Sequence, residues 1–193
     1  MLKTTIFTVL ALLAFAGNSV LCRLALNDNV IDAASFTSIR LLSGAVFLIF
    51  LVLISTKTKI NVKGGNWLSA LFLFLYAATF SYAYITLDTG TGALILFGSV
   101  QLTMIIAGVI KGGKLFAVEW LGFFVAFFGL TILFMPDATA PSLTGFLLMA
   151  SSGIAWGLYT LAGKDSKTPL TDTANNFLKT LPFIALLTLL TVN

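Results

Sequence analysis

Long apolar stretches, separated by short polar and glycine-containing segments, divide the chain into seven parts. Each stretch has close to the roughly 20 residues that a helix needs to cross a hydrocarbon core about 30 Å thick. The strict alternation of apolar and polar residues that is typical of barrel strands is missing. The pattern therefore predicts an all-α polytopic membrane protein. Its seven transmembrane helices are predicted over Thr4–Leu26, Ala33–Ser55, Trp67–Leu87, Gly92–Ile110, Ala117–Met135, Thr144–Gly163 and Asp172–Val192.

The composition agrees with this pattern and excludes several classes of protein. Of the 193 residues 59% are hydrophobic and 9% are charged, whereas about a quarter of the residues of a soluble domain are charged. The chain has one cysteine, Cys22, and no histidine. A disulfide framework and a thiolate metal cluster are thereby excluded, and general-base catalysis near neutral pH lacks its usual residue. We expect no metal, no cofactor and no enzymatic activity.

Charged residues are distributed unequally between the two sets of predicted loops. With the N-terminus inside, the cytoplasmic side holds eight lysines: Lys3, Lys57, Lys59, Lys63, Lys111, Lys114, Lys164 and Lys167. The opposite loops hold no lysine or arginine but four aspartates: Asp28, Asp32, Asp88 and Asp137. The positive-inside rule therefore predicts a cytoplasmic N-terminus in the plasma (bacterial inner) membrane. The net charge of +4 follows from this topology, so we expect the lipid bilayer as a partner and no nucleic acid.

Similar residues recur about 140 positions apart, at corresponding places in the predicted spans. The pairs, 139 to 141 residues apart, are Asp32 with Asp172, Arg23 with Lys164, and Arg40 with Lys179. Five spans separate the two copies, and an odd number inverts the second copy in the membrane. Inverted repeats are typical of secondary transporters. The pattern predicts a first five-helix repeat over residues 1–135 and the start of a second, inverted repeat over 144–193. The chain is then a fragment or is completed by self-association.

Five segments, in this order and spacing, carry a resemblance to a known family: Gly17-Asn18-Ser19-Val20 with Arg23, Phe36 to Leu41, Tyr84 to Val100, Glu119-Trp120-Leu121-Gly122, and Gly153 to Tyr159. Over about residues 10–165 the chain resembles the EamA-type branch of the drug/metabolite transporter superfamily. The resemblance implies a ten-helix fold of two inverted five-helix repeats. It also implies efflux or exchange of a small organic solute, such as an amino acid or a related metabolite. The chain departs from the family at Gln101, where many members have proline, and at Lys114, where glutamate is common.

Polar and aromatic residues inside the predicted spans are the candidates for substrate binding, because a polar atom in a bilayer must find a partner or water. Tyr159 follows Trp156 by three residues, so both lie on one helix face. Their rings would cover an apolar or planar solute, and amide side chains would supply donors and acceptors. We predict that a central cavity is bordered by Asn18, Arg40, Tyr82, Gln101, Trp156 and Tyr159.

Each of these residues also has a purely structural interpretation. Arg40 lies two turns after Asp32, so it would pair with that carboxylate or reach the lipid headgroups. The other candidates would form hydrogen bonds between helices. Arg23, at the end of its span, is expected to be structural. Small residues four apart, Gly153 with Gly157 and Gly122 with Ala126, predict close helix packing.

These features together predict a secondary transporter, an exporter or exchanger, of small organic metabolites that works by alternating access around a midplane cavity. No aspartate or glutamate falls in the middle of a predicted span. Exchange or facilitated diffusion is therefore favoured over proton coupling. The alternative is a seven-helix membrane protein without transport activity, such as a receptor or a retinal-binding protein that uses Lys179. The inverted repeat favours the transporter, because a receptor has no need of one.

Overall fold

The computed structural model describes residues 2–27, 31–55, 64–113, 116–134 and 142–191. Within these ranges every regular element is an α-helix. The helices are α1 (Leu2–Asn27), α2 (Ala33–Ser55), α3 (Trp67–Ala83), α4 (Thr89–Ile110), α5 (Ala117–Phe134), α6 (Leu143–Gly163), α7 (Pro169–Lys179) and α8 (Leu181–Thr191). The predicted all-α fold class is confirmed.

Five helical stretches in the described ranges are long and apolar enough to cross a membrane: α1, α2, α4, α6, and α7 taken together with α8. Helix α3 and residues 117–129 of α5 are apolar but shorter. Helix length and composition therefore indicate a membrane protein, with five of the seven predicted spans long enough by themselves.

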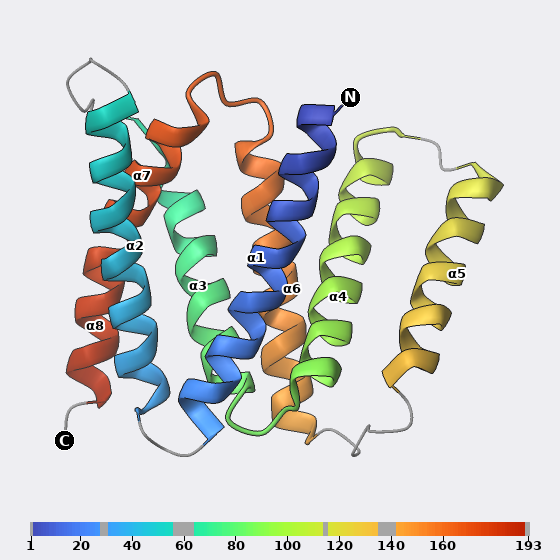
Figure 1. The fold of residues 1–193 in the computed structure, drawn as a ribbon, viewed down its shortest axis with the longest axis horizontal. Coiled ribbons are helices and arrows are strands. Elements are labelled where there is room, and N and C mark those ends of the chain that lie inside the picture. Colours follow the sequence, from blue (N-terminus) through green and yellow to red (C-terminus); the bar gives the residue numbers. More distant parts are fainter. Residues whose placement is uncertain (1, 28–30, 56–63, 114–115, 135–141, 192–193) are drawn as a thin grey trace.

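Successive long helices run in opposite directions, so that the connections alternate between the two ends of the bundle (Figure 1). The connections that hold Lys111, Lys164 and Lys167 lie at the end where α1 begins, and those that hold Asp32 and Asp88 lie at the other. We call these the basic end and the acidic end. The remaining loop charges of the orientation prediction lie outside the described residues: Lys57, Lys59, Lys63, Lys114, Asp28 and Asp137.

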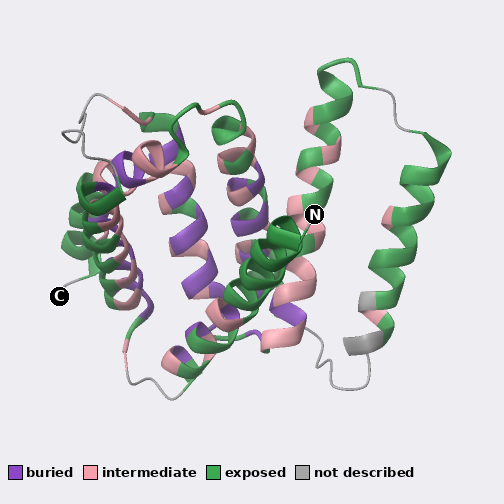
Figure 2. Ribbon diagram, turned by 45° about the horizontal axis from the view of Figure 1, so that its top comes forward, coloured by how far each residue is buried: buried purple, intermediate pink, exposed green. Residues whose placement is uncertain are grey.

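Helices α3 and α6 form the centre of the bundle. Helix α6 packs against α3 on one side and α4 on the other, while α2, α7 and α8 cover the other side of α3. Helix α1 crosses the front of the bundle obliquely, and α5 borders α4 (Figure 1). Buried residues are concentrated on the central helices, whereas the first half of α1 and most of α5 are exposed (Figure 2).

Small residues allow the close approach of α4 and α6. A Cβ atom at Gly153 would lie 2.6 Å from the carbonyl oxygen of Leu96, and one at Gly157 would lie 3.0 Å from the Thr103 side chain. The predicted packing role of this pair is confirmed. At Gly122 on α5, by contrast, no described heavy atom outside its own helix backbone lies within 4 Å of the Cβ position.

The third and the last predicted spans differ most from the helices. The third span was expected to reach Leu87, but α3 ends at Ala83, and a turn with N–H groups bonded to the carbonyls of Phe80 and Ala83 leads into α4. The last span begins earlier, at Pro169, and is interrupted at Thr180. Pro182 explains the interruption, because proline has no N–H and its ring conflicts with the carbonyl four residues earlier.

Asp32 caps the start of α2, and its charge matters for this role. Its carboxylate oxygen Oδ1 accepts a hydrogen bond of 2.9 Å from the backbone N–H of Ser35. Hydrogen bonding with Ser35 lowers the pKa of Asp32. The cap therefore contributes stability above the ordinary pKa of an aspartate, and this contribution is lost as the pH falls through the lowered value.

We expect Asp32→Ala to lower the thermal stability of the detergent-solubilised protein at pH 7, with the difference from the wild type shrinking towards pH 3. The reason is that protonation removes the capping carboxylate from the wild type as well. Melting curves of the two proteins over this pH range measure the effect. A difference that stays constant down to pH 3 would contradict a charge-dependent cap.

Candidate functional site

A cavity of about 450 Å³ lies among α1, α2, α3, α6 and α7. Its size falls within the range of small-molecule sites. Side chains with polar or aromatic groups line it, among them Phe15, Asn18, Arg40, Tyr76, Trp156 and Tyr159. The lining extends towards the basic end as far as Ala11 on α1 and Thr173 on α7.

Arg40 brings a positive charge into this cavity. Its guanidinium carbon lies 5.1 Å from the ring centroid of Tyr76 and 5.0 Å from that of Phe80. These cation–π contacts stabilise the charge. The Nη1 atom is buried and has no hydrogen-bond partner in the described part of the chain. The predicted pairing with Asp32 is not formed, because that carboxylate caps α2 instead.

Aromatic rings from three helices form one wall of the cavity. The ring centroid of Trp156 on α6 lies 4.6 Å from that of Tyr76 on α3, 5.5 Å from that of Tyr159 and 6.0 Å from that of Phe15 on α1. Asn18 Nδ2 donates a 3.4 Å hydrogen bond to the Tyr76 hydroxyl. The rings thus offer an apolar surface, with an amide and a guanidinium beside it.

Four of the six predicted site residues line this cavity: Asn18, Arg40, Trp156 and Tyr159. Tyr82 lines a different hollow near the acidic end. Gln101 faces the space between α4 and α5, which has a volume of about 440 Å³ and is also lined by Glu119. In the first cavity the partly buried Arg40 and several aromatic rings converge, whereas Gln101 and Glu119 are exposed.

Tyr76 is central to the cavity but was not among the six predicted residues. It contacts Asn18, Arg40 and Trp156, and its backbone carbonyl accepts a 3.1 Å hydrogen bond from Ser152 Oγ. A signal was present in the sequence, since the buried positions of α3 include Leu73, Tyr76, Ala77 and Phe80 at helical spacing.

Packed side chains separate the cavity from the acidic end. Phe80 of α3 and Tyr84 in the turn after it are 0% exposed, and Cys22 of α1 and Leu87 are 1% exposed. On both helices these residues follow the cavity-lining positions in the direction of the acidic end. The cavity therefore lies near the middle of the bundle, and packed side chains lie between it and the acidic end.

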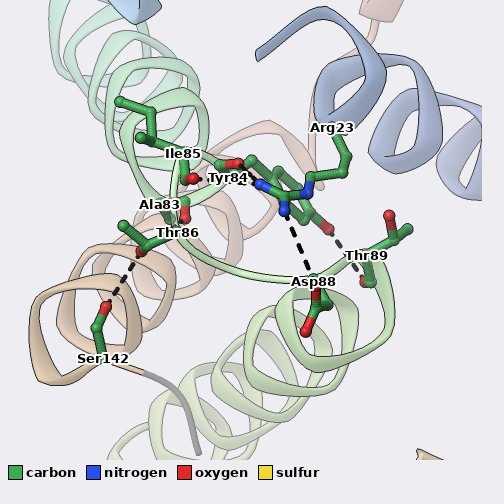
Figure 3. A network of polar contacts seen from close by, with 8 residues as sticks. All are labelled: Arg23, Ala83, Tyr84, Ile85, Thr86, Asp88, Thr89 and Ser142. Atoms are coloured by element: carbon green, nitrogen blue, oxygen red, sulfur yellow. Dashed lines mark hydrogen bonds and ion pairs between the residues drawn. The ribbon is translucent and has the colours of Figure 1, made fainter. Parts of the chain in front are cut away.

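A polar network holds the helices together at the acidic end (Figure 3). Arg23 Nη1 donates hydrogen bonds of 2.8 Å to the Tyr84 carbonyl and 3.2 Å to the Ile85 carbonyl, and Nη2 lies 3.9 Å from Asp88 Oδ1. The Ser142 hydroxyl, at the start of α6, donates a 3.1 Å hydrogen bond to Thr86. The α3–α4 turn is thereby tied to both α1 and α6, and Arg23 has the structural role expected of it.

Lys179 lies outside the cavity, at the basic end. Its Nζ donates hydrogen bonds of 2.8 Å and 3.0 Å to the carbonyls of Gly64 and Gly65. Nearby, Asn176 Oδ1 accepts a 2.8 Å hydrogen bond from the N–H of Asn66. These bonds hold α7 against the start of α3, which places Thr173 and Phe177 in the cavity wall. A retinal protein would use this ammonium group to form a Schiff base. Here the group donates hydrogen bonds to backbone carbonyls.

Comparison with known proteins finds a related bacterial protein. An uncharacterized protein of Pseudomonas aeruginosa is 54% identical over 187 residues, which are 97% of this chain. The match covers 65% of the length of that relative. No protein-family model matches the chain. No solved structure matches it either.

Proposed function

We propose that the protein is a secondary transporter of small organic solutes, of the EamA type, which binds its solute in the cavity between α1, α2, α3, α6 and α7. The observation that carries this proposal is a cavity of about 450 Å³ with an aromatic wall and a partly buried cation, Arg40. It lies among helices of which several are long and apolar enough to cross a membrane. A cavity with a few polar or charged side chains inside a membrane bundle is typical of a solute pathway.

The different surroundings of the cavity towards the two ends support alternating access. Packed side chains and the Arg23 network lie between the cavity and the acidic end, while the lining of the cavity extends towards the basic end. With the basic end in the cytoplasm, as the positive-inside rule predicts, we interpret this arrangement as an inward-facing state. Opening of the acidic end would then give the outward-facing state.

The longer relative supports a ten-helix fold. About a third of its length lies outside the match, which is enough for the three further helices at roughly 20 residues each. Helices α6 to α8 would then begin the second, inverted repeat. The cavity would lie at the interface of the two repeats, where transporters of this type bind their solutes.

The cavity lining also bears on energy coupling. No aspartate or glutamate of the described residues lines it. A carboxylate in the pathway is the usual means of coupling transport to protons. We therefore propose exchange or facilitated diffusion, driven by the gradient of the solute itself.

A transport assay with a matched pair of variants tests the proposal. Full-length protein in proteoliposomes, preloaded with amino acids, organic acids, amines or nucleosides, should exchange at least one class of labelled solute. Trp156→Ala should reduce that exchange about tenfold, because a solute would lose the contact area of a buried aromatic ring. Trp120→Ala removes the same side chain from α5, outside the cavity, and should exchange at the wild-type rate.

Two outcomes would contradict the proposal. One is the absence of exchange for every class of solute by wild-type protein that elutes as a single folded species. The other is a Trp156→Ala variant that exchanges as fast as the wild type and Trp120→Ala, because the solute would then not contact the proposed wall.

A further inference from the structure

We propose that the cavity selects monocarboxylates with an apolar or aromatic remainder, and that Arg40 binds the carboxylate. This inference rests on the proposed function, since it names the chemical class of the solute for the same site. It starts from the charge inside the cavity. Arg40 is the sole charged side chain among the described residues that line it, and its Nη1 group lacks an acceptor.

An unpaired donor of this kind indicates a missing acceptor. Arginine stays protonated at all physiological pH values, so burial does not neutralise it. A buried donor without a partner loses its hydrogen bonds to water and gains nothing in return. Because Asp32 caps α2 and the ion pair at the acidic end belongs to Arg23, the described part of the chain supplies no carboxylate to Arg40. A bound ligand would complete the arrangement.

The surroundings of Arg40 favour a carboxylate over other anions. The rings of Tyr76 and Phe80 contact the guanidinium carbon, which leaves the N–H edge as the part that meets a ligand. That edge matches the two oxygens of a carboxylate in a bidentate arrangement. One cation also balances one negative charge. A phosphate monoester carries a charge of about −1.5 to −2 at pH 7, and the excess would remain unpaired in a cavity of low polarity.

The rest of the cavity determines the other part of the ligand. Trp156, Tyr159 and Phe15 present ring surfaces on the wall beside Arg40. No described acidic side chain is present to bind an ammonium group. An amine on the ligand is therefore not required, and an apolar or aromatic group suits the wall best.

Binding measurements with three isosteric probes test this class. The chain has three tryptophans, so the double variant Trp67→Phe, Trp120→Phe retains Trp156 as the reporter in the cavity. Phenylacetate, phenylacetamide and phenethylamine share one ring and differ in charge. Binding of phenylacetate should change the Trp156 fluorescence. Its affinity should be about tenfold or more above that of phenylacetamide, because hydrogen bonds to charged groups are stronger than those between neutral groups. Phenethylamine should bind no better than the amide.

Variants of Arg40 assign the preference to this residue. In Arg40→Gln the ratio of phenylacetate to phenylacetamide affinity should fall to about one. In Arg40→Lys, which keeps the charge but not the bidentate fork, the ratio should be intermediate. Arg23→Gln is the matched control, because Arg23 lies outside the cavity and the ratio should stay at the wild-type value. If Arg40→Gln does not fold, Arg40→Lys serves as the test, and an unchanged ratio there overturns the assignment.

The same probes separate this inference from the proposed function. If phenylacetate binds selectively but no class of solute is exchanged in proteoliposomes, the carboxylate site stands and the transport proposal fails. If the amide and the carboxylate are exchanged equally well and Arg40→Gln changes neither, transport stands and the carboxylate site is overturned. Laurate tests whether the carboxylate comes from a lipid, because it is a fatty acid with the same charged group. If the protein binds laurate but does not bind phenylacetate, a small-solute site is overturned.

Discussion

Replacing Gly153 with leucine is expected to separate α6 from α4 and to leave little folded protein. A Cβ atom at this position would lie 2.6 Å from the Leu96 carbonyl oxygen, 2.6 Å from the Ser99 Cβ atom and 3.2 Å from the backbone nitrogen of Val100. Two of these three atoms belong to the backbone of α4 and cannot rotate away. Any side chain at Gly153 must therefore push the two helices apart.

The size of the effect follows from the general cost of overpacking, which is about 1–3 kcal/mol and occasionally more. Gly153→Ala, with one extra carbon, should lower the stability by about 2 kcal/mol. Gly153→Leu adds a branched side chain in the same place and should exceed this. Because natural proteins have a total stability of only about 5–15 kcal/mol, the leucine variant should aggregate in detergent.

Size-exclusion chromatography and thermal melting in detergent measure the two variants. Gly108 on α4 is the matched control, since no described heavy atom outside its own helix backbone lies within 4 Å of its Cβ position. Alanine there should be neutral or slightly stabilising, because it favours a helix over glycine. A Gly153→Leu protein that elutes as a single species and melts at the wild-type temperature would show that α4 and α6 do not pack as described.

The helices could be predicted from the sequence because a chain in a bilayer must satisfy its backbone hydrogen bonds internally. Helix α2 has the predicted bounds, Ala33–Ser55, and α6 begins one residue before the predicted Thr144. The interruption at Thr180 was missed, although Pro182 marks it, because a count of apolar residues does not register a missing backbone donor. The end of α3 at Ala83 was missed for a related reason, since the turn that follows is itself mostly apolar.

The cavity was harder to predict than the helices. The prediction used the depth of a residue in the membrane and its type. These two criteria correctly identified Asn18, Arg40 and Trp156 as cavity-lining residues. Hydropathy did not show which side of each helix faces the protein interior. Lipid tails are as apolar as a protein core, so the two sides of a membrane helix have similar hydropathy. Tyr82 and Gln101 were therefore assigned to a cavity that their helix faces do not border, and Tyr76 was left out.

Small residues indicate which side of a membrane helix packs against another helix, which hydropathy does not. Gly153 and Gly157 lie against α4, and Ala70 and Ala77, one heptad apart on α3, are both 0% exposed. Close packing requires such residues. Tyr76 directly precedes Ala77 and is itself 7% exposed, so it lies at the edge of the inner face that these alanines mark.

The acidic end provides the second prediction with a large effect: Arg23→Met should make Cys22 accessible to thiol reagents. Cys22 is the one cysteine of the chain and is 1% exposed. It lies beside Arg23, which holds α1 to the α3–α4 turn through the Tyr84 and Ile85 carbonyls at 2.8 Å and 3.2 Å. Methionine keeps the apolar part of the side chain but donates no hydrogen bond, so α1 loses this attachment.

Hydrogen bonds to charged groups contribute about 1.5–3 kcal/mol to stability. Loss of this contribution should shift the equilibrium between the closed and open acidic end by about tenfold or more, since 1.4 kcal/mol is a factor of ten. In the folded protein, labelling of Cys22 by a water-soluble maleimide should accelerate by the same factor. Methionine at position 23 adds no cation that would favour the reactive thiolate, so faster labelling reports access to the thiol.

Asp88→Asn separates the ion pair from the carbonyl hydrogen bonds. Asp88 lies 3.9 Å from the Arg23 guanidinium with its side chain 51% exposed, and exposed ion pairs contribute about 0–1 kcal/mol. This variant should therefore label only a few times faster than the wild type. Equal labelling of Arg23→Met and the wild type would show that Arg23 does not hold the acidic end closed. Equal acceleration in both variants would place the closing interaction at Asp88, and alternating access would then depend on an exposed ion pair that salt weakens.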